Sequence, residues 1–294
     1  MIDSKTNIVF FSSQLSANYR SCKKDILEAL KENGVQVGMN IRATKDIWAR
    51  DYMPIQIDNN RFVRYKYNPN YLIKRGMSKY VTDKPDCPFL KDKEIIECNL
   101  ILDGGNIVVC GNKVILTEKV FTENSYLSQF EITNRIEKAF GKQVIWIPCD
   151  PHEIEDAKKK NELPLCHADG ILHVIDEETI LLSNYIDYDL DFRTKLFERL
   201  SPYFKIEEYS FGDNSSPNSW IYINYLQIDN IILFPTVDEP ADDMAIAKLK
   251  LLFHNDITIE KIDSKELTFD AKDGNVGGSL HCISWNVYDS SLTE

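Results

Sequence analysis

Residues 105–119 read GNIVVCGNKVILTEK, two short apolar runs joined by a tight polar turn. Three further segments share this plan, with NN, EE or DN near the turn: MPIQIDNNRFVRYKY (53–67), GILHVIDEETILLSN (170–184) and WIYINYLQIDNIILFPT (220–236). Apolar runs that flank residues tolerant of hairpin geometry are typical of β-hairpins. The sequence therefore predicts four hairpins, and GGSLHCISWNV (277–287) is a candidate for a fifth.

Helical patterns and single strands separate the hairpins. Apolar residues recur at helical spacing in 22–34, 121–142, 190–200 and 240–255, and each pattern is followed by a short strand pattern: VQVGM, QVIWIP, YFKIEEYS and DITIEKID. The stretch 71–93 is a poor helix. We expect one short helix and a long loop there, before the strand EIIECNLI.

A helix, a strand, a polar junction and a hairpin thus recur five times, provided that NIVFF (7–11) completes the last unit. Repeats at intervals of about 50 to 65 residues are typical of solenoids and radially repeated folds, and the absence of a composition break favours a ring here. The sequence therefore predicts an α/β fold in which five units close into a ring, with residues 1–294 as a single domain.

Polar residues whose side chains can bind or react with a substrate lie at the junctions, just before or at the start of the hairpins. In the fourth unit the junction is expected at 218–220. The other junctions supply Trp48, Asp51, Asp103, His167, Asp169, His281 and Cys282. Because the junctions occupy corresponding points of every unit, we expect them to meet near the axis of the ring, as blade loops do.

The charge balance indicates the kind of partner. The chain has 34 lysines and arginines against 46 aspartates and glutamates, a formal charge of −12, which argues against a protein that neutralises nucleic-acid phosphates. Converging carboxylates suit a planar guanidinium, because each can accept two parallel N–H bonds. An indole face such as that of Trp48 adds a cation–π contact. A small cationic guanidine is therefore the expected partner.

The cysteines and the N-terminus indicate the compartment. Seven scattered cysteines form no CxxC pair, which is typical of a reducing environment. The start MIDSKTNIVFFSS lacks a basic and apolar leader, and no apolar run approaches the length of a membrane span. We expect a cytoplasmic protein without a membrane contact, and base rates favour a homodimer.

Four ordered motifs carry a family resemblance. WARDYMPI (48–55) resembles a WxRDxGP motif, LDGGNIVV (102–109) an (E/D)GGN element, CHADG (166–170) an HxD element and GGSLHC (277–282) a GGxxHC element. Over nearly its whole length the chain is similar to the agmatine deiminase and bacterial-type peptidylarginine deiminase family of the guanidino-group-modifying superfamily. The resemblance implies the pentein fold, a five-bladed propeller of ββαβ units, and hydrolysis of a guanidine to a ureido group and ammonia without metal or cofactor.

The same resemblance implies roles for individual residues. Cys282 would be the nucleophile, His167 the general acid and base, and Asp51 and Asp169 the carboxylates that grip the guanidinium. Asp103 would be an accessory contact, and its side chain is shorter than the glutamate common at that place, so room is left beside it. Trp48 would contact the substrate. Met53 replaces a small residue, and we expect it to narrow or reshape the pocket near Asp51.

The favoured reaction is deimination of agmatine to N-carbamoylputrescine and ammonia through a covalent thiouronium on Cys282. Deimination of free or peptidyl arginine to citrulline is the nearest alternative. An amidinotransferase and a catalytically idle propeller that binds guanidines remain further hypotheses. Carboxylates near Cys282 should raise the pKa of its thiol, whereas a bound guanidinium should lower it, so that binding and activation become one event.

Ordinary explanations stand beside these roles. A buried core thiol is the alternative for Cys282, a simple turn for Asp103 and plain packing for Trp48. His167 and Asp169 would suit two ligands of a metal ion, but a third histidine at suitable spacing is not evident. The cluster at 149–152 (CDPH) and the lysines at 158–160 are expected to lie in loops.

Overall fold

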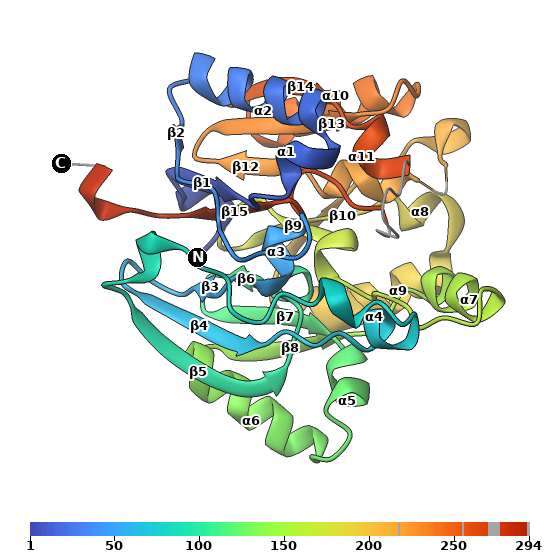
Figure 1. The fold of residues 1–294 in the computed structure, drawn as a ribbon. Coiled ribbons are helices and arrows are strands. Elements are labelled where there is room, and N and C mark those ends of the chain that lie inside the picture. Colours follow the sequence, from blue (N-terminus) through green and yellow to red (C-terminus); the bar gives the residue numbers. More distant parts are fainter. Residues whose placement is uncertain (217, 255, 270–276, 293–294) are drawn as a thin grey trace.

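The computed structural model describes residues 1–216, 218–254, 256–269 and 277–292, and five three-stranded sheets of one design form its frame (Figure 1). The strand orders are β15 (Ser284–Val287), β1 (Ile8–Phe11), β2 (Gln36–Val37); β3 (Ile55–Gln56), β4 (Arg61–Lys66), β5 (Glu94–Ile101); β6 (Val108–Cys110), β7 (Lys113–Thr117), β8 (Gln143–Ile147); β9 (Leu172–Val174), β10 (Thr179–Leu182), β11 (Lys205–Glu208); and β12 (Leu226–Ile228), β13 (Ile231–Thr236), β14 (Thr258–Asp263). All four predicted hairpins are thereby confirmed. The candidate fifth at 277–287 supplies only the strand β15, which pairs antiparallel with β1 from the other end of the chain and forms no hairpin of its own within the described residues.

Each sheet is an antiparallel pair of strands extended by one parallel strand, and in four of the five described sheets the antiparallel pair is a hairpin. The middle strand pairs antiparallel with one neighbour and parallel with the other, and the parallel strand follows a helical connection. The main connecting helices are α2 (Arg20–Glu32), α4 (Asn70–Lys74), α6 (Gln129–Phe140), α9 (Leu190–Leu200) and α10 (Ala241–Leu252). Figure 1 shows α2, α10 and α6 on the outside of the sheets. The short α4, with a long connection to β5, confirms the expectation for 71–93.

The first sheet closes the ring with strands from opposite ends of the chain. Ile8 pairs with Val287, and the register continues to Phe11 and Ser284. The strand NIVFF therefore completes the last unit, as predicted, and the α/β propeller of five ββαβ units is confirmed.

Two predictions about helices were wrong, one of a single helical segment and one of loops. The pattern at 121–142 is split into α5 (Lys119–Glu123) and α6, because the Ser128 hydroxyl and the Glu131 side chain form a capping box that starts a new helix. The predicted loops around 149–160 form α7 (Pro151–Lys159). The Asp150 carboxylate caps α7 by accepting from the His152 N–H at 2.8 Å, and proline suits the first helical position.

The remaining short helices are α1 (Leu15–Asn18), α3 (Ala49–Tyr52), α8 (Tyr185–Tyr188) and α11 (Lys265–Phe269). Within the described ranges, no helix is both long and apolar enough to cross a lipid bilayer.

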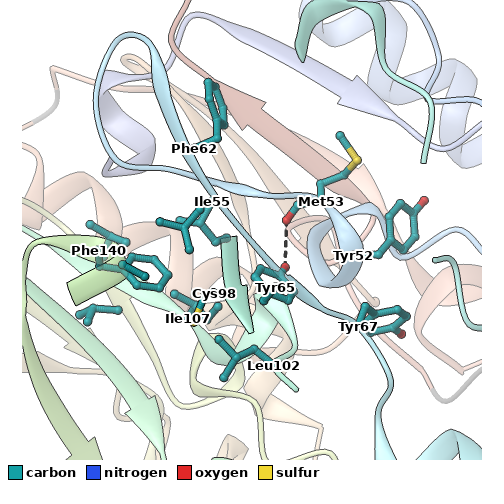
Figure 2. Packing of buried hydrophobic residues seen from close by; sticks show 14 of the residues in the cluster. Tyr52, Met53, Ile55, Phe62, Tyr65, Tyr67, Cys98, Leu102, Ile107 and Phe140 are labelled. Atoms are coloured by element: carbon teal, nitrogen blue, oxygen red, sulfur yellow. Dashed lines mark hydrogen bonds between the residues drawn. The ribbon is translucent and has the colours of Figure 1, made fainter. Parts of the chain in front are cut away.

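The core anchors the junction that carries Asp51. The Tyr65 hydroxyl bonds the backbone carbonyls of Asp51 at 2.8 Å and Met53 at 2.9 Å, and Figure 2 shows the second of these bonds. Met53 is fully buried in the apolar cluster that also contains Tyr52 and Ile55. The expectation that Met53 narrows the pocket is therefore wrong, because its side chain packs into the core and does not line the cavity described below. That Met53 reshapes the pocket stays a prediction.

The junctions lie together in the middle of the five sheets. Three of them form short 3₁₀ turns, η4 (Gly104–Asn106), η5 (Ala168–Gly170) and η7 (Ser219–Ile223). Helix α3 contacts η4, η4 contacts η5, and η5 contacts η7. This confirms the prediction that the junctions meet.

Candidate active site

Hydrogen bonds connect the five junctions in a closed circuit. The bonds are Gly105 N–H to Asp51 Oδ1 at 3.1 Å, His167 Nε2 with Asp103 Oδ2 at 3.1 Å, Asn224 Nδ2 to Asp169 O at 3.2 Å, His281 N–H to Asn224 O at 3.1 Å, and Arg50 N–H to Cys282 O at 3.1 Å. The fold thus brings Asp51, Asp103, His167, Asp169 and Cys282 into one region. They come from four units of the sequence and are linked through Asn224 of the remaining unit.

Gly105 marks the point on which three side chains converge. A Cβ added at Gly105 would lie 2.7 Å from His167 Nδ1, 2.8 Å from Asp51 Oδ1 and 3.2 Å from Asp169 Oδ1. Only glycine lets the backbone approach these groups so closely. The same geometry shows that an imidazole and two carboxylates face a common small volume, which is the arrangement expected for holding a planar cation.

The thiol of Cys282 lies at the edge of this volume. Its Sγ is 3.1 Å from Asn224 Oδ1 and 4.0 Å from Asp169 Oδ2. Desolvation in the pocket, followed by the charges of Asp169 and Asp51, raises the pKa of the Cys282 thiol well above its ordinary value. In the absence of a bound cation the thiol is therefore neutral at pH 7.

His167 is held between two carboxylates. Its Nε2 lies 3.1 Å from Asp103 Oδ2 and its Nδ1 lies 3.7 Å from Asp51 Oδ1. Burial on its own would lower the pKa of His167, but the charge of Asp51 and the hydrogen bond to Asp103 outweigh burial and raise the pKa to about 9. The ring is therefore an imidazolium at neutral pH and has a proton to give.

Asp51 is the carboxylate most sensitive to pH. It is only 5% exposed, and burial raises its pKa to about 6 even though the neighbouring His167 opposes the shift. The negative charges of Asp103 and Asp169 add to the rise. Asp51 is therefore ionised at neutral pH, and a cation bound beside it would be stabilised strongly because the surroundings supply little solvent screening.

The ammonium of Lys119 occupies the room beside Asp103. Its side chain is 4% exposed, it forms a salt bridge with Asp103, and its Nζ is 3.5 Å from Glu123 Oε1. The ammonium also lies 4.8 Å from the centre of the Tyr71 ring. Sequence analysis missed Lys119, because a lysine at the end of a hairpin is usually exposed and nothing local indicates a buried partner.

We expect Lys119→Met to lower the free energy of unfolding by about 3–5 kcal/mol, because it removes the counterion of the buried Glu123 and leaves the buried Asp103 with His167 alone. Urea denaturation at pH 7 measures the change. Lys24→Met is the control, since Lys24 pairs with Glu28 at 3.5 Å on the surface and should contribute less than about 1 kcal/mol. Equal losses in the two variants would contradict a structural role for the buried ion pair.

Asp169 is supported by a second buried pair. His281 Nδ1 lies 2.7 Å from Asp169 Oδ2, and His281 Nε2 lies 3.2 Å from Asp3 Oδ2. Burial opposes ionisation of Asp169, but the bond to His281 lowers its pKa below the ordinary value. Asp169 therefore stays ionised. The role of Asp3 was missed, because nothing local relates it to a histidine near the other end of the chain.

The alternative of a metal pair is not supported by these contacts. His167 and Asp169 bond to Asp103 and His281, as described above. Among the residues that the structure describes, no group of three or more His, Cys, Asp and Glu side chains is placed to hold a metal ion.

Trp48 and Asn224 complete the surroundings of the thiol. Trp48 is half-buried and lines a narrow cavity with Asp51, His167 and Cys282, as expected of a substrate contact. Asn224 was missed because the junction was expected at 218–220, whereas the 3₁₀ turn η7 moves the polar contact further along the chain. The sequence feature that could have indicated it is the amide of Asn224 within the otherwise apolar and aromatic run WIYINYL.

Comparisons with known proteins agree with this geometry. Residues 6–287 match the family described as Porphyromonas-type peptidyl-arginine deiminase. A Shewanella baltica protein provisionally named an agmatine deiminase is 24% identical over 310 residues, which cover 90% of this chain and 80% of that protein. The agmatine deiminase of Enterococcus faecalis has a similar structure, with a TM-score of 0.71 and 15% identity over 98% of this chain and 95% of that chain. DDAH from Pseudomonas aeruginosa has a TM-score of 0.54 and 10% identity over 96% and 99% of the two chains.

The structural likeness confirms the pentein fold. The family match covers all four motifs and nearly the whole chain, and it confirms the resemblance together with the prediction of a hydrolase that acts on C–N bonds. The chain belongs to the Porphyromonas-type peptidyl-arginine deiminase family.

Proposed function

We propose that this protein hydrolyses the guanidinium group of a small cationic guanidine, with agmatine as the favoured substrate and N-carbamoylputrescine and ammonia as products. The observation that carries the proposal is the convergence of His167, Asp51 and Asp169 on Gly105, with the sulfur of Cys282 4.0 Å from Asp169 Oδ2. All five units contribute a group to this region, which supports regarding residues 1–294 as one catalytic domain.

Binding and activation of the thiol are coupled in the proposed mechanism. Asp51 and Asp169 accept N–H bonds from the guanidinium and place its carbon next to the sulfur of Cys282. The positive charge offsets the two carboxylates that raise the thiol pKa, so the pKa falls and the proton leaves to solvent. The thiolate forms at the moment when the electrophilic carbon is in place.

The chemical steps then follow with their protons accounted for. The thiolate attacks the guanidinium carbon to form a C–S bond and a tetrahedral adduct. His167 gives its proton to one nitrogen, the C–N bond breaks, and ammonia leaves a thiouronium on Cys282. The neutral His167 takes a proton from water, and the resulting hydroxide attacks the same carbon. The C–S bond breaks, the sulfur leaves as the thiolate and takes up the proton of the added hydroxyl group, and the product leaves as a neutral ureido group.

A kinetic comparison tests the substrate. We expect kcat/KM for ammonia release to be about 10²-fold higher with agmatine than with arginine, because an α-carboxylate would be repelled by the acidic cavity described below. Arginine peptides with blocked ends separate peptidyl-arginine deimination from both. Release of ammonia from none of these guanidines would contradict the proposed function, and faster turnover of arginine or its peptides would contradict agmatine as the substrate.

A further inference from the structure

The active-site cavity extends far beyond the guanidinium pocket. A cavity of about 770 Å³ is lined by Cys282, His167 and Asp169 and also by residues of α7 and α8. Cavities of roughly 300–1,000 Å³ accommodate drug-sized ligands. Agmatine, a four-carbon chain with one amine, would leave most of this space to solvent, so the cavity has room for a longer substrate.

Three carboxylates that line this cavity, Asp150, Glu153 and Asp187, accept hydrogen bonds from neutral partners. Asp150 Oδ2 accepts from the Tyr185 hydroxyl at 2.8 Å, and Glu153 Oε1 accepts from the Cys166 N–H at 2.8 Å. Asp187 accepts from the Ser210 hydroxyl at 2.8 Å and from the Phe211 N–H at 2.7 Å. None of the three forms a salt bridge with another residue in the described part of the chain.

Two basic side chains that line the cavity already have carboxylate partners. Lys159 Nζ lies 3.1 Å from Asp156 Oδ1, and His152 Nε2 lies 2.9 Å from Asp189 Oδ2. The charges of Asp150, Glu153 and Asp187 are therefore not neutralised from within the cavity wall. Burial raises the pKa of Glu153, and a bound cation beside it would reverse that shift.

Aromatic side chains line the same cavity. Tyr185, Tyr188 and Trp220 line the cavity together with the three carboxylates, and Tyr185 is joined to Asp150 by its hydroxyl. Aromatic faces attract ammonium groups and pack against methylene chains. Carboxylates beside aromatic faces match a chain of methylenes interrupted by ammonium groups, whereas a carboxylate-bearing ligand would be repelled by Asp150, Glu153 and Asp187.

We propose that this outer cavity, formed by Asp150, Glu153, Tyr185, Asp187, Tyr188 and Trp220, binds the polyamine tail of guanidines longer than agmatine that carry two or more ammonium groups. The inference rests on the proposed function and specifies its substrate class as guanidino-polyamines. The inference rests on three observations: Cys282 lines the same cavity, three of its carboxylates form no salt bridge with another described residue, and three aromatic side chains lie beside them in the lining.

The test compares agmatine with N-(3-aminopropyl)agmatine, which adds one ammonium group to the same guanidine. We expect kcat/KM to be about tenfold or more higher for the longer compound, because a charge-assisted bond is gained. In a Glu153→Gln/Asp187→Asn protein this preference should fall to about one, since the amides keep the shape and remove the charge. Asp191→Asn, an exposed change on α9, is the matched control and should keep the wild-type preference.

A binding measurement separates this inference from the proposed function. Calorimetric titration of Cys282→Ala protein with spermidine, which has no guanidine, should give a Kd at least about tenfold lower than titration of the protein that also carries Glu153→Gln and Asp187→Asn. Such binding without turnover of any guanidine would retain the outer cavity and reject the proposed function. Turnover of agmatine with no preference for the longer guanidine, or spermidine binding unaffected by the two amides, would overturn the inference.

Discussion

Replacing Cys282 with alanine is expected to lower ammonia release from agmatine by about 10³-fold or more, because the attacking atom is removed and the remaining groups only bind and polarise the substrate. Among the described residues that line the cavity, Cys282 is the one cysteine, so no neighbouring thiol can replace it. The measurement is the initial rate of ammonia release at saturating agmatine, with circular dichroism to show that the variant is folded.

Cys98→Ala is the matched control for this change. Cys98 is a buried thiol on β5, away from the cavity, and its loss should reduce stability without reducing turnover. Mass spectrometry of wild-type protein quenched during turnover should show an amidino increment on the peptide that contains Cys282. Near-wild-type turnover by Cys282→Ala would reject covalent catalysis at this residue, even if binding of guanidines were retained.

The repeated hairpins made the fold predictable from the sequence. Each hairpin is a local structure, because its two apolar runs and its turn lie within about 17 residues and define their own register. Closure of the ring was also predictable, since NIVFF lacked a partner in its own unit and the last unit lacked a strand. Helix α7 was not predicted, because its start CDPH was interpreted as a loop although Asp150 and Pro151 have the pattern of a helix cap.

The candidate site was predictable where a motif contains the residue and missed where only the fold creates the contact. Asp51, His167 and Cys282 belong to ordered motifs. Lys119 pairs with Asp103 over 16 positions, and Asp3 reaches His281 across almost the whole chain. No sequence pattern of short period records such pairs, because they depend on how the units are placed around the axis.

The ionisation of the resting site leads to the last prediction. At neutral pH the Cys282 thiol is neutral and His167, with a pKa of about 9, is protonated, so this pair of residues holds two protons. The state that attacks the substrate, a thiolate beside an imidazolium, holds one proton. We therefore expect kcat/KM to rise about tenfold per pH unit up to about pH 9, because the singly protonated pair becomes more abundant. Bound guanidinium lowers the thiol pKa, so kcat should level off at a lower pH than kcat/KM does.

His167→Asn separates the contribution of the imidazole from that of the thiol. Asparagine retains a hydrogen bond to Asp103 but cannot protonate the leaving ammonia or activate water, so kcat should fall by about 10²- to 10⁴-fold. In this variant the thiol titrates without the imidazole, and the rise of kcat/KM should continue beyond pH 9, because the pKa of the thiol is well above its ordinary value.

His254→Asn is the control: His254 is exposed with a φ of 51°, which asparagine tolerates, and both the rate and the pH profile should be those of the wild type. A wild-type kcat/KM that is flat between pH 7 and pH 9, or a His167→Asn protein with an unchanged profile, would mean that the two groups do not share the proton that this mechanism requires.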